Sequence, residues 1–204
     1  PSPRFTDTSK AHGEALGEHG EQTHGMLLYE PTVRVPLLLG CPSPTPPKGR
    51  VNRRLVGLVD LRPSIEELLG FPVTLPCDGQ SFLGPDTPRD RSVYLETMEP
   101  RDVGGWSPLF GLRAAEGKYI EGPVKRFFDL KEDPKEVVNL YNSKPPGLAA
   151  LAQALQERQR TSTNPAAGAR AMSDEEIERL ASLGYVHGGK QAATSAAVDP
   201  EAML

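Results

Sequence analysis

The sequence has few cysteines, no excess of positive charge and no long apolar run, and each shortage excludes a class of protein. Its two cysteines, Cys41 and Cys77, are too few for the disulfide framework of a small secreted domain. The 23 basic residues are outnumbered by 27 acidic ones, giving a net charge of −4, so a nucleic-acid partner is not expected. No stretch approaches the roughly 18 apolar residues of a membrane-spanning helix, and no signal-like apolar region opens the chain.

Proline is the residue in excess. It makes up 21 of the 204 residues, about twice the average share, which limits long helices and predicts short elements joined by irregular loops. With 37% hydrophobic and 25% charged residues, the composition is that of a globular chain of one or two domains. The chain begins with Pro1 rather than Met, and we take this as an indication that it is part of a longer protein.

Apolar runs and turn residues predict the elements of the first half. Four glycines within residues 12–25 argue against a continuous helix there and favour a loop with short turns. The apolar run at 33–39 is expected to be a buried strand. A helix is expected over 63–69, because proline suits its first turn and Gly70 can end it.

The second half has a different texture, with short apolar stretches separated by Gly, Pro and Asp. It predicts an antiparallel meander of four strands, at 92–98, 111–115, 118–121 and 126–130. An amphipathic helix is expected over 148–159, then a polar linker over 161–171 and a short capped helix over 173–184. Beyond Val186 the Gly, Ala and Ser content predicts disorder.

Three of the four histidines, His12, His19 and His24, lie within thirteen residues of one another. Nearby acidic residues are Glu14, Glu18, Glu21 and Glu30. Imidazoles and carboxylates together can hold a divalent metal. The H-E-x-x-H spacing of zinc proteases does not occur, so on spacing alone a solvated, Glu-rich loop is the simpler interpretation and a metal site the alternative.

The order of the motifs shifts the balance between these two interpretations toward a functional site. The first series reads S-x-x-H-G-E-A-L-G-E-H-G-E-Q-T-H-G, L-L-Y-E-P-T-V-R-V-P-L-L-L, L-V-D-L-R-P-S-I and D-G-Q-S-F. The later motifs are G-W-S-P at 105–108, G-K-Y-I at 117–120, F-D-L-K-E-D-P at 128–134, N-L at 139–140 and L-G-Y-V at 183–186. This series, over residues 8–140 and 172–186, resembles the C-terminal half of the catalytic domain of the sulfatase family, of the bacterial type, within the alkaline phosphatase superfamily.

The resemblance implies an α/β fold. Residues 1–90 would be the C-terminal part of an alkaline-phosphatase-like doubly wound domain. Residues 91–160 would form a small antiparallel sheet with a packed helix. Residues 161–204 would be a linker, a short capped helix and a disordered tail.

The resemblance also implies two site residues. His12 takes the second place of an Asp-His or Asp-Asn pair that completes a divalent-metal site, calcium in intact members. Ala11 stands where the pattern expects Asp, and a methyl group cannot ligate a cation, so one expected ligand is missing. His24 matches a position where relatives place Lys or His against the sulfate or phosphate. A catalytic role follows for His24, because a protonated imidazole would offset charge on the anion or the leaving oxygen.

Other polar residues are expected to have structural roles. His19 is expected to be exposed to solvent, and so is Lys118, since it alternates with apolar neighbours along a strand. Arg34 is expected to brace the edge of a strand through carboxylate or backbone bonds. His187, in the tail, carries no expected function.

The nucleophile of the family is missing from the sequence. Sulfatases use a formylglycine made from Cys or Ser in C/S-x-P-x-R, and neither 41–45 nor 77–81 fits that pattern. The resemblance therefore implies a C-terminal fragment of a metal-dependent hydrolase of sulfuric or phosphoric esters, inactive alone and compatible with a periplasmic or extracellular place. The alternative is a non-catalytic binding or interaction module derived from a sulfatase.

Overall fold

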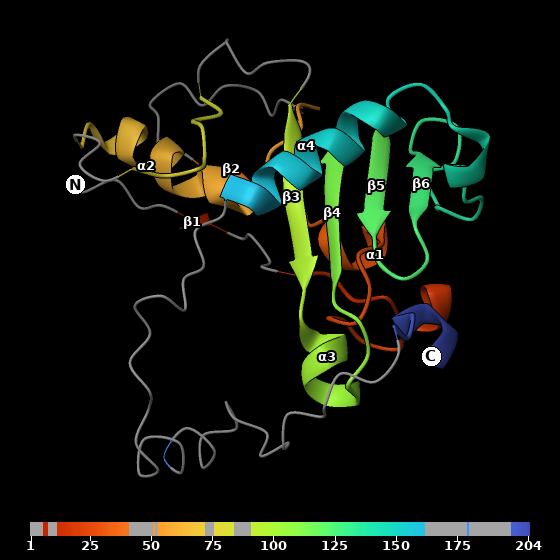
Figure 1. Ribbon diagram of the computed structural model, residues 1–204. Coiled ribbons are helices and arrows are strands. Elements are labelled where there is room, and N and C mark those ends of the chain that lie inside the picture. The colour runs from red at the N-terminus through yellow and green to blue at the C-terminus, as the bar shows by residue number, and fades with distance from the viewer. Residues whose placement is uncertain are drawn as a thin grey trace.

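A four-stranded antiparallel sheet is the centre of the structure (Figure 1). The computed structural model describes residues 6–7, 12–40, 51, 53–71, 76–83, 91–161, 179 and 197–204. The strands, in their order across the sheet, are β3 (Ser92–Thr97), β4 (Leu109–Ala114), β5 (Gly117–Glu121) and β6 (Arg126–Asp129). The helix α3 (Glu99–Gly104) connects β3 to β4, and the short 3-10 helix η3 (Tyr141–Ser143) follows β6.

The predicted meander is confirmed, with the bounds of each strand within two residues of those expected. The strand β4 begins two residues earlier than expected, because Leu109 pairs with Thr97 and so matches the full length of β3. The predicted helix after the meander is also confirmed, as α4 (Leu148–Thr161).

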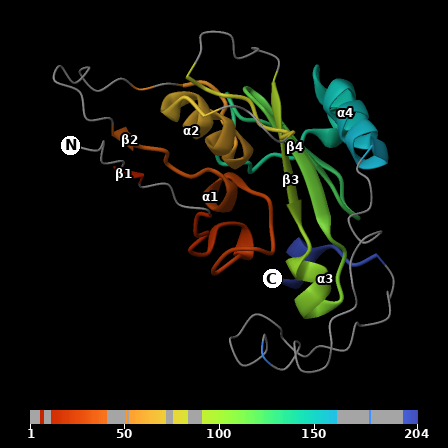
Figure 2. The same ribbon diagram turned by 90° about the vertical axis from the view of Figure 1, so that its left-hand side faces the viewer.

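Both faces of the sheet are covered, as the turned view in Figure 2 shows. On one face α4 packs against the sheet, and the buried residues there are Leu112, Tyr119, Phe127, Leu148 and Leu155. On the other face lie residues 26–29 and the short helix α1 (Glu30–Val33). The core on that side contains Leu27, Leu28, Tyr29, Leu109, Ile120 and Phe128. Neighbouring residues of one strand therefore enter different cores, as expected for side chains that alternate across a strand.

The expectation that Lys118 faces solvent is wrong. Its side chain is fully buried, on the same face of β5 as Ile120. Its Nζ lies 2.9 Å from Oε1 of Glu30 and 2.7 Å from Oε1 of Glu136, and it donates to the carbonyl of Leu28 at 3.0 Å. A buried charge is tolerated only when it is paired in this way.

The two carboxylates around Lys118 respond differently to burial. Burial raises the pKa of Glu136, and the opposing charge of Lys118 does not overcome this. Burial also acts to raise the pKa of Glu30, but the hydrogen bonds from Arg113 and the charge of Lys118 outweigh it and hold that pKa below its ordinary value. Glu30 is therefore the carboxylate most firmly held in its ionised form.

A smaller buried cluster connects residues 57–64 with Gln80 and Arg91. The carboxylate of Asp60 is fully buried and accepts from the backbone N–H groups of Gly57 and Gln80, each at 2.8 Å. Its Oδ1 also lies 2.5 Å from Nη2 of Arg91. Asp60 ends the 3-10 helix η2 (Leu58–Asp60) and leads into α2 (Leu61–Leu69). The predicted helix end is confirmed, because Gly70 adopts the left-handed conformation with φ 69°.

The strand expected over 33–39 is wrong. Val33 ends α1, and in the described part of this segment only β2 (Leu39–Gly40) is a strand, paired antiparallel with β1 (Thr6–Asp7). Pro31 favours a helical first turn, and Pro36 has no N–H to give to a neighbouring strand. An apolar run alone therefore did not produce a strand here.

The expectation of a disordered tail beyond Val186 is wrong for residues 197–204. This segment forms the 3-10 helix η5 (Pro200–Met203), and Pro200 is buried. The polar linker and the capped helix expected over 161–184 lie outside the described residues, apart from Thr161 and Arg179.

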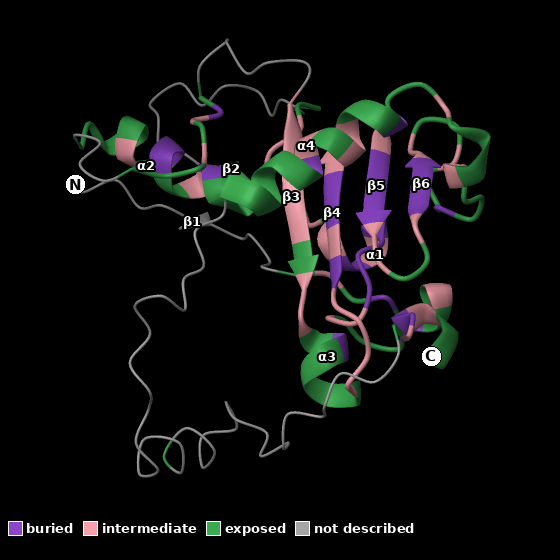
Figure 3. Cartoon of the chain, viewed as in Figure 1, coloured by how far each residue is buried: buried purple, intermediate pink, exposed green. Residues whose placement is uncertain are grey.

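One cluster of exposed apolar side chains lies on η2, on α2 and just after α2, and Figure 3 shows much of α2 unburied. The exposed residues there are Leu58, Val59, Ile65, Leu68, Leu69 and Phe71. Such a cluster is typical of a surface that another element covers. Among the helices that the structure describes, none is long and apolar enough to cross a membrane.

We predict that replacing Lys118 by Met lowers the free energy of unfolding by about 3–5 kcal/mol, because two buried carboxylates lose their cation. The matched control is Lys125→Met. Lys125 follows the same strand, is half-exposed and pairs with Glu121 at 2.9 Å, so its loss should cost at most about 1 kcal/mol. Urea unfolding at neutral pH measures both, and equal small losses would contradict a structural role for Lys118.

Limited proteolysis should distinguish the two halves of the chain. We expect residues 92–160 to resist, together with 26–33, because both contribute to the core around the sheet. Cleavage should come first within 53–83, where apolar side chains are exposed. Uniform resistance along the chain, measured by mass spectrometry of the fragments, would show that the first half needs no further covering element.

Candidate active-site loop

The loop over residues 12–25 folds back on itself as a hairpin. The N–H of Ala15 donates to the carbonyl of Thr23 at 2.7 Å, and the N–H of Gly17 donates to the carbonyl of Glu21 at 2.8 Å. The 3-10 helix η1 (Glu18–Gly20) forms the tip. The expected loop with short turns is confirmed.

The base of this hairpin is held to the rest of the protein. The N–H of Gly13 donates to the carbonyl of Thr32 at 2.8 Å, and a Cβ at Gly13 would lie only 2.0 Å from the carbonyl oxygen of Pro31. Only glycine fits such a close approach. On the other arm, the hydroxyl of Thr97 donates to the carbonyl of Gly25.

Glu21 fixes the chain that leaves the hairpin. Its carboxylate is buried and accepts from the N–H groups of Met26 at 2.7 Å and Leu27 at 3.2 Å. Burial raises the pKa of Glu21, although the two backbone hydrogen bonds act in the opposite direction. Glu21 is thus a structural acceptor, not a member of a metal cluster.

His12 and His24, the two site residues predicted by resemblance, lie side by side. Their rings stack with centroids 3.9 Å apart and planes 17° apart. Oε1 of Glu14 lies 3.0 Å from Nδ1 of His24. One ligand atom from each of these three residues can be chosen so that all lie within 4.8 Å of one another, and no other such group occurs among the described residues.

The remaining candidates lie apart from this cluster. His19 is half-buried rather than freely exposed, because it stacks on Tyr29 at 3.7 Å with the planes 5° apart, and its Nε2 is 3.1 Å from the carbonyl of Lys135. Arg34 is exposed, and its side chain braces no strand edge through any bond to a described residue. Ala11, Cys41 and His187 lie outside the described residues.

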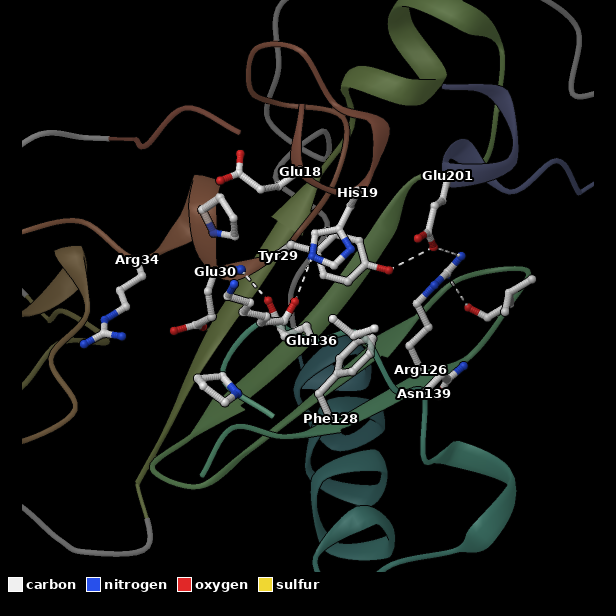
Figure 4. A pocket seen from close by; sticks show the side chains of 15 residues that line it. Glu18, His19, Tyr29, Glu30, Arg34, Arg126, Phe128, Glu136, Asn139 and Glu201 are labelled. Atoms are coloured by element: carbon white, nitrogen blue, oxygen red, sulfur yellow. Dashed lines mark hydrogen bonds and ion pairs between the residues drawn. The ribbon is translucent and has the colours of Figure 1, made fainter. Parts of the chain in front are cut away.

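A pocket of about 780 Å³ opens between the hairpin tip, β6 and the C-terminal residues (Figure 4). Its walls include His19, Tyr29, Arg34, Arg126, Phe128, Glu136 and Glu201. His12, Glu14 and His24 do not line it. The cluster predicted to carry chemistry and the pocket are therefore separate features.

The family model for the C-terminal part of N-sulphoglucosamine sulphohydrolase matches residues 17–164. The chain belongs to the sulfatase family. Arylsulfatase K of Danio rerio is 29% identical over 148 residues, covering 66% of this chain and 27% of the relative. The chain spans about a quarter of the length of the curated relatives it matches.

Solved structures confirm the expected fold class. A Bacteroides fragilis protein assigned to the sulfatases superimposes with a TM-score of 0.64 at 19% identity, covering 79% of this chain and 36% of that one. A solved complex of another protein with its substrate, D-glucosamine-2-N,6-O-disulfate, gives a TM-score of 0.59 at 22% identity, covering 76% and 34%. The fold is the α/β fold of alkaline-phosphatase-like sulfatases, with the antiparallel sheet and its helix as the second part.

Glu14 is the site residue that sequence reasoning did not separate from its acidic neighbours. The hairpin pairs Ala15 with Thr23, and one step further along the two arms brings Glu14 opposite His24. The signal lay in the positions of the loop glycines, which allow this register, and not in the spacing of acidic residues. In this chain, the register of the hairpin therefore decides which carboxylate reaches His24.

Proposed function

We propose that this chain is the C-terminal part of a metal-dependent hydrolase of sulfuric esters, and that the 12–25 loop contributes to its active site. The observation that carries the proposal is the meeting of His12 and His24 on the loop whose motifs resemble those of sulfatases. His24 lies within the range that the family model matches. The sulfatase names of the relatives favour sulfuric over phosphoric esters, and a bacterial origin stays a prediction.

His24 would contact the sulfate group of the substrate. Nδ1 of its ring is engaged by Glu14, and among the described residues Nε2 has no hydrogen-bond partner. A carboxylate on one ring nitrogen orients an imidazole and leaves the other nitrogen free for a ligand. From Nε2 the protonated ring would donate to an oxygen of the anion or to the leaving oxygen.

His12 would contribute to a divalent-metal site. Sulfatases generally depend on a divalent metal, calcium, which takes about 6–8 oxygen ligands. The cluster offers two imidazoles and one carboxylate, so it fits calcium poorly and a borderline ion such as Zn²⁺ or Mn²⁺ better. Because the two rings are stacked, both would have to turn before their nitrogens faced one ion, and both side chains are exposed enough to do so. A His24 ring that ligates an ion is unprotonated, so the metal-bound cluster and the protonated His24 that contacts the anion would be two alternative states of the loop.

This chain alone would not turn over sulfate esters. Neither Cys41 nor Cys77 lies in the C/S-x-P-x-R pattern from which the family's nucleophile is made. Since displacement at sulfur needs a nucleophile and a metal assembled in advance, catalysis would require the groups that other parts of a sulfatase supply. The exposed apolar face of α2 supports this, since it offers a surface on which such a part could pack.

Calorimetric titration with divalent ions tests the metal site. We expect Zn²⁺ or Mn²⁺ to bind with micromolar affinity, Ca²⁺ to bind much more weakly, and His12→Ala to abolish binding. Glu18→Ala is the matched control, because Glu18 belongs to the same loop, is exposed and lies outside the cluster. If no ion binds, or if Glu18→Ala has the same effect as His12→Ala, the assignment of His12 is wrong.

Determining the coding sequence upstream of Pro1 tests the proposal as a whole. We expect an in-frame C/S-x-P-x-R motif and a pair of Asp residues, and we expect hydrolysis of an aryl sulfate only by a protein that includes them. Absence of both in a continuous reading frame would refute the proposal. A monodisperse 204-residue protein that binds a partner but neither metal nor sulfate would instead favour the non-catalytic module.

A further inference from the structure

The last residues of the chain lie against the hairpin that carries the histidine cluster. Asp199 caps η5, since its carboxylate accepts from the N–H of Glu201 at 3.1 Å, and Pro200 is fully buried. The N–H of Ser107 donates to the carbonyl of Val198 at 3.0 Å. The match to the sulfatase family ends at residue 164, so this segment lies outside the matched domain.

Arg126 on β6 holds the C-terminal segment in place. Its guanidinium is buried and forms a two-pronged pair with Asp199, with Nη1–Oδ2 3.0 Å and Nη2–Oδ1 2.6 Å. Nη2 also lies 2.6 Å from Oε2 of Glu201. Both carboxylates paired with Arg126 in the described part of the chain thus come from the C-terminal segment. Since a buried guanidinium without an anion is strongly unfavourable, β6 needs this segment.

The same segment reaches the hairpin through two contacts. The hydroxyl of Tyr29 donates to Oε2 of Glu201 at 2.9 Å, and His19 stacks on the Tyr29 ring. Figure 4 shows the Tyr29 hydroxyl and the Arg126 guanidinium reaching the same carboxylate, with the His19 ring over Tyr29. In addition, Cβ of Leu204 lies 3.4 Å from where a Cβ on Gly20 would be.

The hairpin needs support at this point. Its base is fixed by the bonds at Gly13 and Gly25, but the tip contains Leu16 and His19 with φ of 53° and 54°. Residues other than glycine rarely adopt this left-handed backbone conformation, and it persists only where the surrounding structure holds it. The stack on Tyr29 and the contact of Gly20 with Leu204 lie at that tip.

We propose that residues 199–204 act as a strap that positions the 12–25 loop, and that Glu201 is its positioning residue. The strap ties the hairpin tip to β6 through Tyr29 and Arg126, and thereby maintains the register that sets Glu14 opposite His24. That the register serves an active site rests on the proposed function. That residues 199–204 hold the loop in place does not.

Hydrogen exchange measured by mass spectrometry tests the strap. In a chain ending at residue 196, the amides of Ala15 and Gly17, which are bonded across the hairpin, should exchange at least about tenfold faster. Peptides from β4 and β5 should keep their protection. A synthetic peptide of residues 197–204 added in trans should restore slow exchange in the loop.

Two variant peptides provide the specificity control. With Glu201→Gln, restoration should need a peptide concentration about tenfold higher, because the charged acceptor shared by Arg126 and Tyr29 becomes neutral. Met203→Ala changes an exposed residue of the same helix and should leave restoration unchanged. Unchanged loop exchange after truncation would overturn the proposal, and so would equal loss of protection in β4 and β5, which would make the segment a general part of the core.

Variants of the full chain connect the strap to the site. Tyr29→Phe and Glu201→Ala remove the donor and the acceptor of one hydrogen bond, so each should weaken Zn²⁺ binding at the cluster severalfold, and the double variant should add little to the loss seen with Glu201→Ala. Additive losses would mean that the two residues act separately and would contradict the strap. If the unaltered chain binds no metal, the metal site fails while the exchange experiment still decides on the strap.

Discussion

The buried ammonium of Lys118 is the interaction on which the arrangement of this protein depends. It joins β5, Glu30 of α1 and Glu136 of the loop that follows β6. Arg113 adds a second cation to Glu30, 3.1 Å from Oε2, from the neighbouring strand. Detachment of any of these elements would leave an unpaired charge in the apolar core. The sheet therefore fixes residues 26–33, and with them the chain that leaves the hairpin.

The buried guanidinium of Arg126 fixes the opposite end of the hairpin. Lys118 acts at the base, through α1, while Arg126 acts at the tip, through Glu201 and Tyr29. Both cations belong to adjacent strands of one antiparallel sheet, so the hairpin is held at two points of one rigid frame. A loop with left-handed residues at its tip can keep a single conformation under this condition.

Local sequence patterns predicted the elements but not what covers them. The meander and α4 followed from turn residues and from apolar spacing, which are properties of short segments. The expectation that Lys118 faces solvent was wrong, because alternation along β5 gives a solvent-facing side only when no other element packs on that side of the sheet. Residues 26–33 pack there. The role of Arg126 depends on Asp199, 73 positions away, and no local pattern records such a pairing. His12 and His24 came from resemblance, whereas Glu14 required the hairpin register.

The histidine cluster differs from these buried anchors because all three of its side chains are exposed. The structure thus combines buried anchors with imidazole and carboxylate groups that remain accessible. The backbone of the loop is held in advance, so binding of an ion would need only the two stacked imidazole rings to turn. Here the ordering comes from charges buried beneath the loop, so substitutions that leave the cluster intact but disturb Lys118 or Arg126 would alter its geometry. The geometry of the cluster therefore depends on these anchors as well as on the histidines themselves.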